Sequence, residues 1–241
     1  HRFDQEYIAL SSLDHENVLK VYDRGEIYNH PYFSMDLLDG IVLKEAVAKW
    51  VDLPPTQRFE KAEDILIQTT RALDHIHQLG WVHRDVTPAN IMILSDGTVK
   101  LMDFGVVKMP GHELTVVGEV IGTAAYISPE QIKGDLVDSR ADLYALGTSL
   151  YLMLTGRGPF SARTLAGYLD KHLRQEPDPP HVHAPMAPTK LERACLRLLK
   201  KDPDKRFASA NHLLRYLNAT ATRTPDRLIG RIWEISRVRD R

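Results

Sequence analysis

The chain has 241 residues, of which 43% are hydrophobic and 26% are charged. This composition can bury a sizeable core, so intrinsic disorder is excluded and one globular domain, with one or two lobes, is expected. The 31 Lys and Arg residues nearly balance the 32 Asp and Glu residues, which gives a formal charge of -1. A bulk electrostatic case for nucleic acid or an anionic membrane as partner is therefore excluded.

Cysteine usage and hydropathy point to the cytoplasm. The single Cys195 cannot form an internal disulfide, no Cys/His cluster has zinc-finger spacing, and Cys195 itself is predicted to be a small apolar residue inside a helix. The longest uncharged run, 143–156, is too short to span a bilayer and is predicted to be a buried helix. We therefore expect a cytoplasmic chain with no membrane segment in the sequence given.

The first predicted elements in chain order are a helix and a hairpin. Apolar residues recur at spacings of three and four near the N-terminus, at Phe3, Tyr7, Leu10 and Leu13. Two runs rich in β-forming residues, 18–22 and 32–35, flank a turn region that contains Gly25, Asn29 and Pro31. They predict an antiparallel hairpin.

The middle of the chain predicts a helix, a second hairpin and a long loop. An apolar stripe predicts a helix over 60–79, with Gly80 as its left-handed cap. Runs 91–94 and 99–101 flank an Asp-Gly pair, which is a strong hairpin signal. Residues 104–128 have no sustained period, and connections of that length inside a compact domain are usually functional.

The rest of the chain is predicted to be helical. Helices are expected at about 139–154, 162–175, 188–200 and 208–218. Residues 220–241 hold six arginines against three acids and are interpreted as an Arg-rich linker or tail.

Two motifs in order carry the chemistry. Residues 81–90 read WVHRDVTPAN, and thirteen residues after Asn90 comes Asp103-Phe104-Gly105 at the end of the Asp-Gly hairpin. An HRD triplet with Asn five residues after its Asp, followed by DFG beyond a hairpin, resembles the catalytic and metal-binding loops of protein kinases.

Phosphoryl transfer explains why these residue types are needed. The protein must position the reactants, while magnesium neutralises charge on the phosphate oxygens. Magnesium takes hard oxygen ligands and usually only one or two carboxylates from a protein, which suits Asp103 and the amide oxygen of Asn90. Asp85 is then free to accept a hydrogen bond from the substrate hydroxyl. His83 and Phe104 are interpreted as packing residues.

The resemblance extends downstream and is most similar to bacterial serine/threonine protein kinases of the eukaryotic-like type. Residues 122–130 (GTAAYISPE) resemble the substrate-docking segment, with Ser128 where the family usually has Ala. The resemblance implies that Asp142 holds the catalytic-loop backbone and that Arg206 pairs with Glu130. Residues 155–160 (TGRGPF) and 128–131 (SPEQ) are typical of this branch, and the resemblance runs from Glu6 to about Leu217.

The fold implied by the resemblance is α+β, with a mainly α-helical large lobe and a remnant of the β-rich small lobe. The expected division is a small-lobe remnant over 1–38 with a hinge at 36–38, a large lobe over 39–219, and the tail over 220–241. No Gly-x-Gly-x-x-Gly occurs, and no lysine precedes Glu6. Because Asp85, Asn90 and Asp103 are intact, truncation of the first three small-lobe strands is a simpler explanation than degeneration.

The resemblance also implies a nucleotide site. Glu6 falls at the helical glutamate that pairs with the ATP-positioning lysine, although a solvated surface charge is an equal reading. Met35 resembles the gatekeeper. Adenine would meet the backbone of Asp36 and Leu38 and lie against Met92. The internal spine would be formed by Leu10, Val21, His83 and Phe104, for which core packing is the conservative interpretation.

Regulation is implied at the loop. In the family, the arginine before the catalytic Asp, here Arg84, gathers a phosphorylated activation-loop residue, because a phosphate offers charge and acceptors to Arg. Thr115, eight residues before Thr123 of the docking segment, is the candidate phosphosite, with an unmodified loop residue as the alternative. The resemblance also assigns Thr123, in the docking segment, to the catalytic site. Thr87 replaces the lysine that commonly contacts the transferred phosphate, which predicts slower transfer.

The expected function is transfer of the γ-phosphoryl of Mg-ATP to Ser or Thr hydroxyls of protein substrates, with the chain itself, in trans, as a further candidate substrate. The expected cofactors are ATP and Mg²⁺, and the chain alone is expected to be a weak enzyme. The resemblance leaves open whether the parent protein is tethered to a membrane. One alternative is a pseudokinase or scaffold that docks partners on the large lobe. A small-molecule phosphotransferase and a metalloenzyme built on His75-x-His77 or His181-x-His183 are weaker alternatives.

Overall fold

The computed structural model describes residues 13–28, 30–103 and 124–221. Its helices and strands are, in chain order, β1 (Val21–Ile27), β2 (His30–Met35), β3 (Gly40–Val42), α2 (Leu43–Lys49), α3 (Pro55–Gln78), β4 (Ile91–Leu94), β5 (Val99–Leu101), α5 (Pro129–Lys133), α6 (Arg140–Thr155), α7 (Leu165–Arg174), α8 (Thr189–Leu198) and α9 (Ala210–Ala221). Short 3-10 turns lie at Trp50–Asp52, Pro180–Val182 and Pro203–Lys205.

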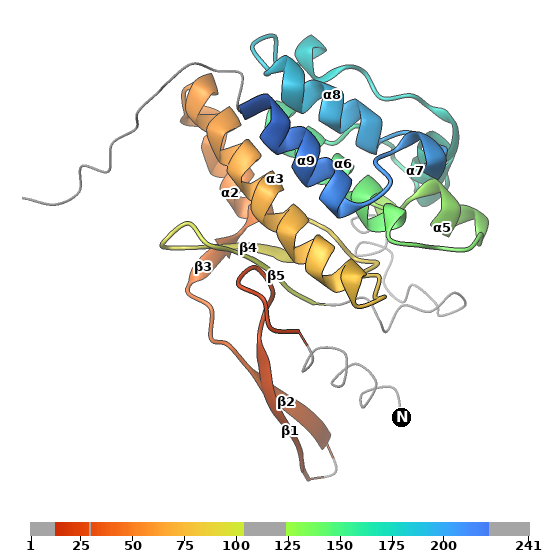
Figure 1. Cartoon of the computed structure of the whole chain (residues 1–241). Helices are drawn as coiled ribbons and strands as arrows, with labels where there is room; N and C mark the ends of the chain where they lie inside the picture. The colour runs from red at the N-terminus through yellow and green to blue at the C-terminus, as the bar shows by residue number, and fades with distance from the viewer. Residues whose placement is uncertain (1–12, 29, 104–123, 222–241) are drawn as a thin grey trace, which may run out of the picture.

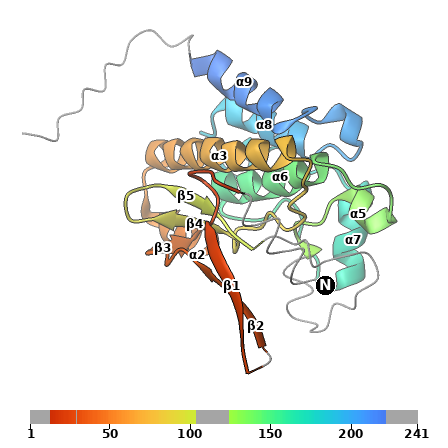
Figure 2. The same cartoon turned by 60° about the horizontal axis from the view of Figure 1, so that its bottom comes forward.

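The helices form one layered body against a small sheet. α3 packs against α6, α9 and β5, and α6 packs against α8 (Figure 1). The sheet has the order β3-β4-β5 and is antiparallel throughout. The separate β1–β2 hairpin projects away from the helices, as both views show (Figures 1 and 2). An α+β fold with a mainly helical large part is confirmed.

α6 is the central helix, because nearly every residue of it is buried. Its uncharged run predicted a buried helix, and the structure confirms this. An all-round apolar helix must be covered on all sides, and here α3, α8 and the 3-10 turn at 180–182 contact it. The core continues through Leu66, Leu73, Ile76 and Leu101, each with no exposed surface.

The second predicted hairpin is confirmed residue for residue. β4 and β5 pair antiparallel with Ile91 opposite Leu101, and the turn between them has Gly97 at φ +89°. Asp96 Oδ1 accepts a hydrogen bond from the Thr98 backbone N–H at 2.8 Å. This is the local bond by which Asp favours a turn, while glycine supplies the positive φ. Gly80, at φ +79°, ends α3 as predicted.

The first hairpin is shifted from its prediction. β1 begins at Val21, not at 18, because Val18 makes a bridge with Leu101 and Leu19 N–H donates to Leu101 O at 3.0 Å. Gly25 was predicted in the turn but lies inside β1 opposite Tyr32, whose ring occupies the space a side chain would need. Local propensity alone assigns residues 18–20 to the hairpin strand, but their long-range contact with β5 keeps them out of it.

Other boundaries differ for identifiable reasons. α3 begins at Pro55, five residues before the predicted start, because proline is well placed in the first turn of a helix, where its missing N–H has no intrahelical partner. β3, α2 and α5 were not predicted, because all three are too short to repeat a hydrophobic period several times. The four later helices are confirmed within two or three residues. The predicted helix over the first thirteen residues, most of loop 104–128 and most of tail 220–241 lie outside the described residues.

Candidate active site

A buried carboxylate on α6 holds the loop that follows α3. Asp142 is 1% exposed. Its Oδ2 accepts from the His83 backbone N–H at 2.8 Å and its Oδ1 from the Arg84 backbone N–H at 2.7 Å. The His77 ring nitrogen Nε2 lies 2.8 Å from Oδ2 as a third partner. A buried charge with several donors is compensated, so the loop backbone is fixed just before Asp85, as the resemblance implied.

Asn90 and Asp85 are joined directly. Asn90 Nδ2 donates to the Asp85 backbone oxygen at 2.9 Å and to Asp85 Oδ2 at 3.0 Å. Both partners can only accept, so the amide nitrogen must face them and the amide oxygen Oδ1 is directed elsewhere. Asn90 is 8% exposed, so this orientation is enclosed by the fold. The chain thus offers an oriented carboxylate and an amide oxygen at one place.

The second motif is brought to the first by a backbone bond. Met102 N–H donates to Asn90 O at 2.9 Å. The next residue along the chain, Asp103, adopts φ +50°, and Arg84 adopts φ +65°. Non-glycine residues with positive φ are uncommon and cluster at functional sites. Among the described residues, this strain therefore occurs at Arg84, directly before Asp85, and at Asp103, the proposed metal ligand.

His83 holds the loop from inside, as predicted. Its ring Nε2 lies 3.0 Å from Met102 O, and its Nδ1 accepts from Asp85 N–H at 3.3 Å. These contacts require the neutral tautomer with the proton on Nε2. Burial lowers the pKa of His83 below its ordinary value, so the ring stays neutral and bridges the two motifs.

Thr87 stands where the lysine is common. It is 8% exposed, and its backbone N–H donates to Asp85 O at 2.9 Å. The next residue, Pro88, accepts at its carbonyl from Lys44 N–H at 3.1 Å. The loop is therefore closed on itself and attached to the first turn of α2.

The predicted adenine-binding residues border the sheet. Asp36 N–H donates to Lys20 O at 3.0 Å, and the Asp36 carboxylate accepts from the Tyr22 hydroxyl. Within the described ranges, Leu38 N–H donates to no backbone oxygen. Met92 on β4 is half-buried opposite Val42. Asp36 and Leu38 thus lie just before β3, and β3 pairs with β4, the strand that carries Met92.

The predicted gatekeeper and spine are only partly described. Met35, the residue that resembles the gatekeeper, is 44% exposed in this chain. It ends β2 opposite Val21, in a hairpin with no further strand in the described structure. Val21 and His83 are buried, whereas Leu10 and Phe104 lie outside the described residues, as do Glu6, Thr115 and Thr123.

The late arginine makes the implied ion pair. Arg206 donates from both terminal nitrogens to the Glu130 carboxylate, at 2.7 and 2.8 Å, and is 2% exposed. It also donates to the carbonyl oxygens of Arg140, Lys200 and Lys201. Ser128 caps α5, because its hydroxyl accepts from Gln131 N–H while Gln131 Oε1 accepts from Ser128 N–H. This capping box gives Ser128 a structural role in place of the usual Ala.

Sequence reasoning missed two partners in this site. His77 was considered only as half of a weak metal pair, but it lies against Asp142, a partner 65 residues away along the chain. Met102 acts through its backbone, which carries no residue-type signal. His181 lies beside Glu192 on α8. Among the described residues, no three His, Cys, Asp or Glu side chains gather as a metal-ion group.

The family comparison decides what this geometry belongs to. The model of the protein kinase domain matches residues 1–216. The chain belongs to the protein kinase domain family. The chain is 40% identical over 219 residues to a probable serine/threonine-protein kinase of Streptomyces coelicolor. This alignment covers 88% of the chain and 32% of that relative. The chain is also 40% identical over 217 residues to serine/threonine-protein kinase PknB of Mycolicibacterium smegmatis, covering 87% of the chain and 34% of the relative.

Solved structures agree with the fold. The kinase domain of Mycobacterium tuberculosis PknI superposes with a TM-score of 0.68 at 29% identity, covering 90% of this chain and 77% of that one. The chain is therefore similar, in sequence and in fold, to the kinase domains of bacterial serine/threonine protein kinases. It spans about a third of the length of the curated relatives it matches. In the described part of the chain, no helix has the length and apolar character needed to cross a membrane.

Proposed function

We propose that this chain carries the catalytic centre of a serine/threonine protein kinase that transfers the γ-phosphoryl of ATP to hydroxyls of protein substrates. The observation that supports the proposal is the double hydrogen bond from Asn90 Nδ2 to Asp85, combined with the backbone bond from Met102, the residue before Asp103, to Asn90. These contacts support a site in which Asp85, Asn90 and Asp103, from two motifs, act together in phosphoryl transfer.

In this proposal Asp85 accepts a hydrogen bond from the incoming hydroxyl and orients it for in-line attack. Its carboxylate is held by Asn90 from one side, and its backbone is held by the two hydrogen bonds to Asp142 just upstream. Such preorganisation reduces the entropy that must be lost on reaching the transition state. The loop thus contributes positioning, while Asp85 contacts the reacting hydroxyl.

Asn90 and Asp103 fit a magnesium ion by the chemistry of their donors. The amide oxygen of Asn90 is directed away from Asp85, and Asp103 supplies one carboxylate, which matches a cation that takes one or two carboxylates and completes its shell with phosphate and water. When bound, magnesium neutralises charge on the phosphate oxygens. The backbone of Asp36 and Leu38 and the side chain of Met92 would receive adenine.

The loop arginine supports regulation in the same proposal. Arg84 is held at positive φ beside the Asp142 contact, so its side chain leaves the loop from a fixed backbone. We propose that it pairs with phosphorylated Thr115, because a phosphate brings about -1.5 to -2 charges and strong acceptors for Arg. Thr123 would complete the site, and Glu6 would align the nucleotide. The same proposal divides the chain into a small-lobe remnant (1–38), a large lobe (39–219) and an Arg-rich tail (220–241).

The test is transfer of labelled γ-phosphate from Mg-ATP. The longest reading frame that contains this chain is assayed for labelling of itself and of a generic protein substrate, beside Asp85→Asn and the exposed control Asp135→Asn. We expect label with the wild type and with the control variant, and loss of label with Asp85→Asn. Equal label in all three would contradict the role of Asp85. No label in any, with nucleotide binding retained, would favour the scaffold alternative.

A further inference from the structure

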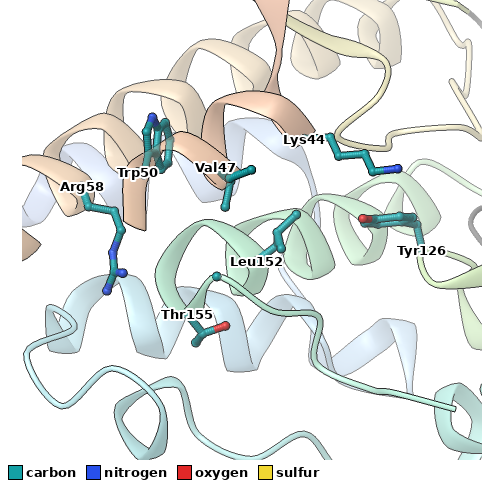
Figure 3. Close-up of a pocket in the computed structure, with 9 residues that line it drawn as sticks. Lys44, Val47, Trp50, Arg58, Tyr126, Leu152 and Thr155 are labelled. Carbon is teal, nitrogen blue, oxygen red and sulfur yellow. The ribbon is translucent and has the colours of Figure 1, made fainter. Parts of the chain in front are cut away.

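A pocket of about 450 Å³ opens between α2 and the end of α6, apart from the residues assigned above. Its lining comprises Lys44, Val47, Ala48, Trp50, Arg58, Tyr126, Leu152, Thr155 and Gly156. Figure 3 shows Lys44 and Tyr126 at one end and Arg58 at the other, with Val47 and Leu152 between them. The volume lies in the range of ordinary ligand sites.

The pocket adjoins the catalytic loop through a backbone contact. Lys44 N–H donates to Pro88 O at 3.1 Å, and Pro88 is three residues after Asp85 in the same loop. Tyr126 enters from the segment that leads to the Ser128 cap of α5. A polypeptide whose hydroxyl lies at Asp85 would therefore need only a few residues, at about 3.3 Å each, to reach the pocket.

The walls combine apolar surface with positive charge. Val47, Trp50 and Leu152 supply apolar side chains, while Lys44 and Arg58 bring two cations, and no Asp or Glu lines the pocket. Neither cation forms an ion pair within the residues that the structure describes. An anion entering the pocket would therefore meet complementary charge without competition from a carboxylate of the lining.

Arg58 provides an independent sign that something is missing from the pocket. Its Nε is enclosed and has no hydrogen-bond partner in the described structure. Enclosed polar atoms are almost always paired, since an unpaired one costs about 1–3 kcal/mol. The guanidinium also lies over the Phe59 ring, with Cζ 5.1 Å from the ring centre, which fixes its position beside the pocket. A carboxylate is the acceptor that a guanidinium binds best.

We propose that this pocket binds a segment of the protein substrate in which an aliphatic side chain is flanked by Asp or Glu, within a few residues of the phosphorylated hydroxyl. The aliphatic side chain packs on Val47 and Leu152, and the carboxylates pair with Lys44 and Arg58. The inference rests on the proposed kinase function and gives it a substrate class: Ser or Thr sites in acidic, aliphatic surroundings.

Peptide pairs test the preference. Acceptor peptides that differ only in a Leu-Glu or a Leu-Lys pair, placed in turn at each position within four residues of a single Thr, are compared by kcat/KM. We expect about a tenfold preference for Leu-Glu at the best position, which corresponds to about 1.4 kcal/mol. Lys44→Glu should abolish or invert this preference, and Arg58→Gln should reduce it. The matched controls Lys49→Glu on α2 and Lys61→Glu on α3 are exposed and outside the lining, so both should retain it.

A binding assay separates this inference from the kinase proposal. The same peptides carry a fluorophore, and anisotropy is measured with wild-type and variant protein in the absence of ATP. If a generic protein is phosphorylated but the peptide pairs are turned over and bound equally, the docking inference is wrong and the kinase function stands. If no phosphate is transferred but Leu-Glu peptides bind in a Lys44-dependent way, the docking stands and the kinase proposal fails. If Lys49→Glu lost the preference for Leu-Glu peptides as fully as Lys44→Glu, the assignment of this preference to the pocket would also be wrong.

Discussion

Asn90 Nδ2 lies 3.0 Å from Asp85 Oδ2 and donates a hydrogen bond to it, so the two residues that the proposed mechanism uses in different roles fix each other. The donor orients the carboxylate, and the carboxylate orients the amide. A change at either residue should therefore alter both the hydroxyl-binding and the metal-binding groups, which makes this contact the most sensitive point of the site.

Replacement of that donor should abolish activity without unfolding the protein. Asn90→Asp puts two carboxylates at hydrogen-bond distance and removes the orienting N–H. We expect phosphoryl transfer to fall by about 100-fold or more, with a smaller fall of the thermal midpoint because an enclosed acceptor then faces a second one. Asn211→Asp, on exposed α9 surface, is the matched control. Activity of Asn90→Asp close to that of the control would show that the contact is dispensable.

Weakening the anchor on α6 should loosen the loop. Asp142→Asn removes the charge and converts one acceptor oxygen to a donor facing an N–H group of His83 or Arg84. We expect a loss of about 2 kcal/mol in the free energy of unfolding, the range for a hydrogen bond to a charged group. Amide hydrogen exchange at these two residues should accelerate. Unchanged protection of both amides would contradict the anchoring role.

The Glu130–Arg206 pair should be costly to break from one side. Because Arg206 is 2% exposed, Glu130→Gln leaves a buried charge without its partner, and we expect a loss of about 3–5 kcal/mol by denaturant unfolding. Arg140 pairs with Asp138 and Asp204 at the surface, so Arg140→Met should cost about 1 kcal/mol or less. Similar losses in the two variants would show that burial does not set the cost.

Stability should fall in mild acid through His172. Burial lowers its pKa to about 4, and its Nδ1 lies 2.9 Å from the Tyr144 hydroxyl. Between pH 6.5 and about 4 the unfolded chain binds a proton at this histidine and the folded chain does not, so the free energy of unfolding falls as pH is lowered across this window. The full effect is up to about 3 kcal/mol.

The control for that pH effect is His172→Gln, which keeps a polar side chain but cannot titrate. Its unfolding free energy should depend less steeply on pH between 6.5 and 4 than that of the wild type. Well above pH 6.5 the histidine is neutral in both the folded and the unfolded chain, so this position should contribute nothing there to the pH dependence of either protein. Parallel pH profiles for the two proteins would exclude His172 as the source.

Close packing of α6 on α8 should be sensitive to one methyl group. A Cβ added at Gly147 would lie 2.7 Å from Leu198 Cβ, which is shorter than packed side chains tolerate. Gly147→Ala should lower the free energy of unfolding by about 1–3 kcal/mol by overpacking. At Gly158 the nearest atom would be 3.4 Å away, so Gly158→Ala should change it little. A stable Gly147→Ala protein would show that the helices separate at low cost.

The sequence by itself determined the family and most regular elements of this protein. The HRD and DFG motifs, their spacing and the Asp-Gly hairpin between them are local patterns, and local patterns report residue type and short-range turn geometry. Among the long helices, α3 was predicted because it displays several turns of an apolar stripe, and α6 because its sequence contains a long uncharged run. Arg206 and Glu130 were paired by resemblance, and the structure confirms that pair.

Beyond Asp142 and His83, only the tertiary structure decided which residues hold the site in place. His77 and Asp142 are 65 residues apart in the chain, and Val18 joins Leu101 in place of the predicted strand, because these contacts depend on how helices and strands pack. Backbone donors such as Met102 N–H have no side-chain signature. The pocket between Lys44 and Arg58 likewise exists only because α2, α3 and α6 converge there, so its charge pattern is invisible along the sequence.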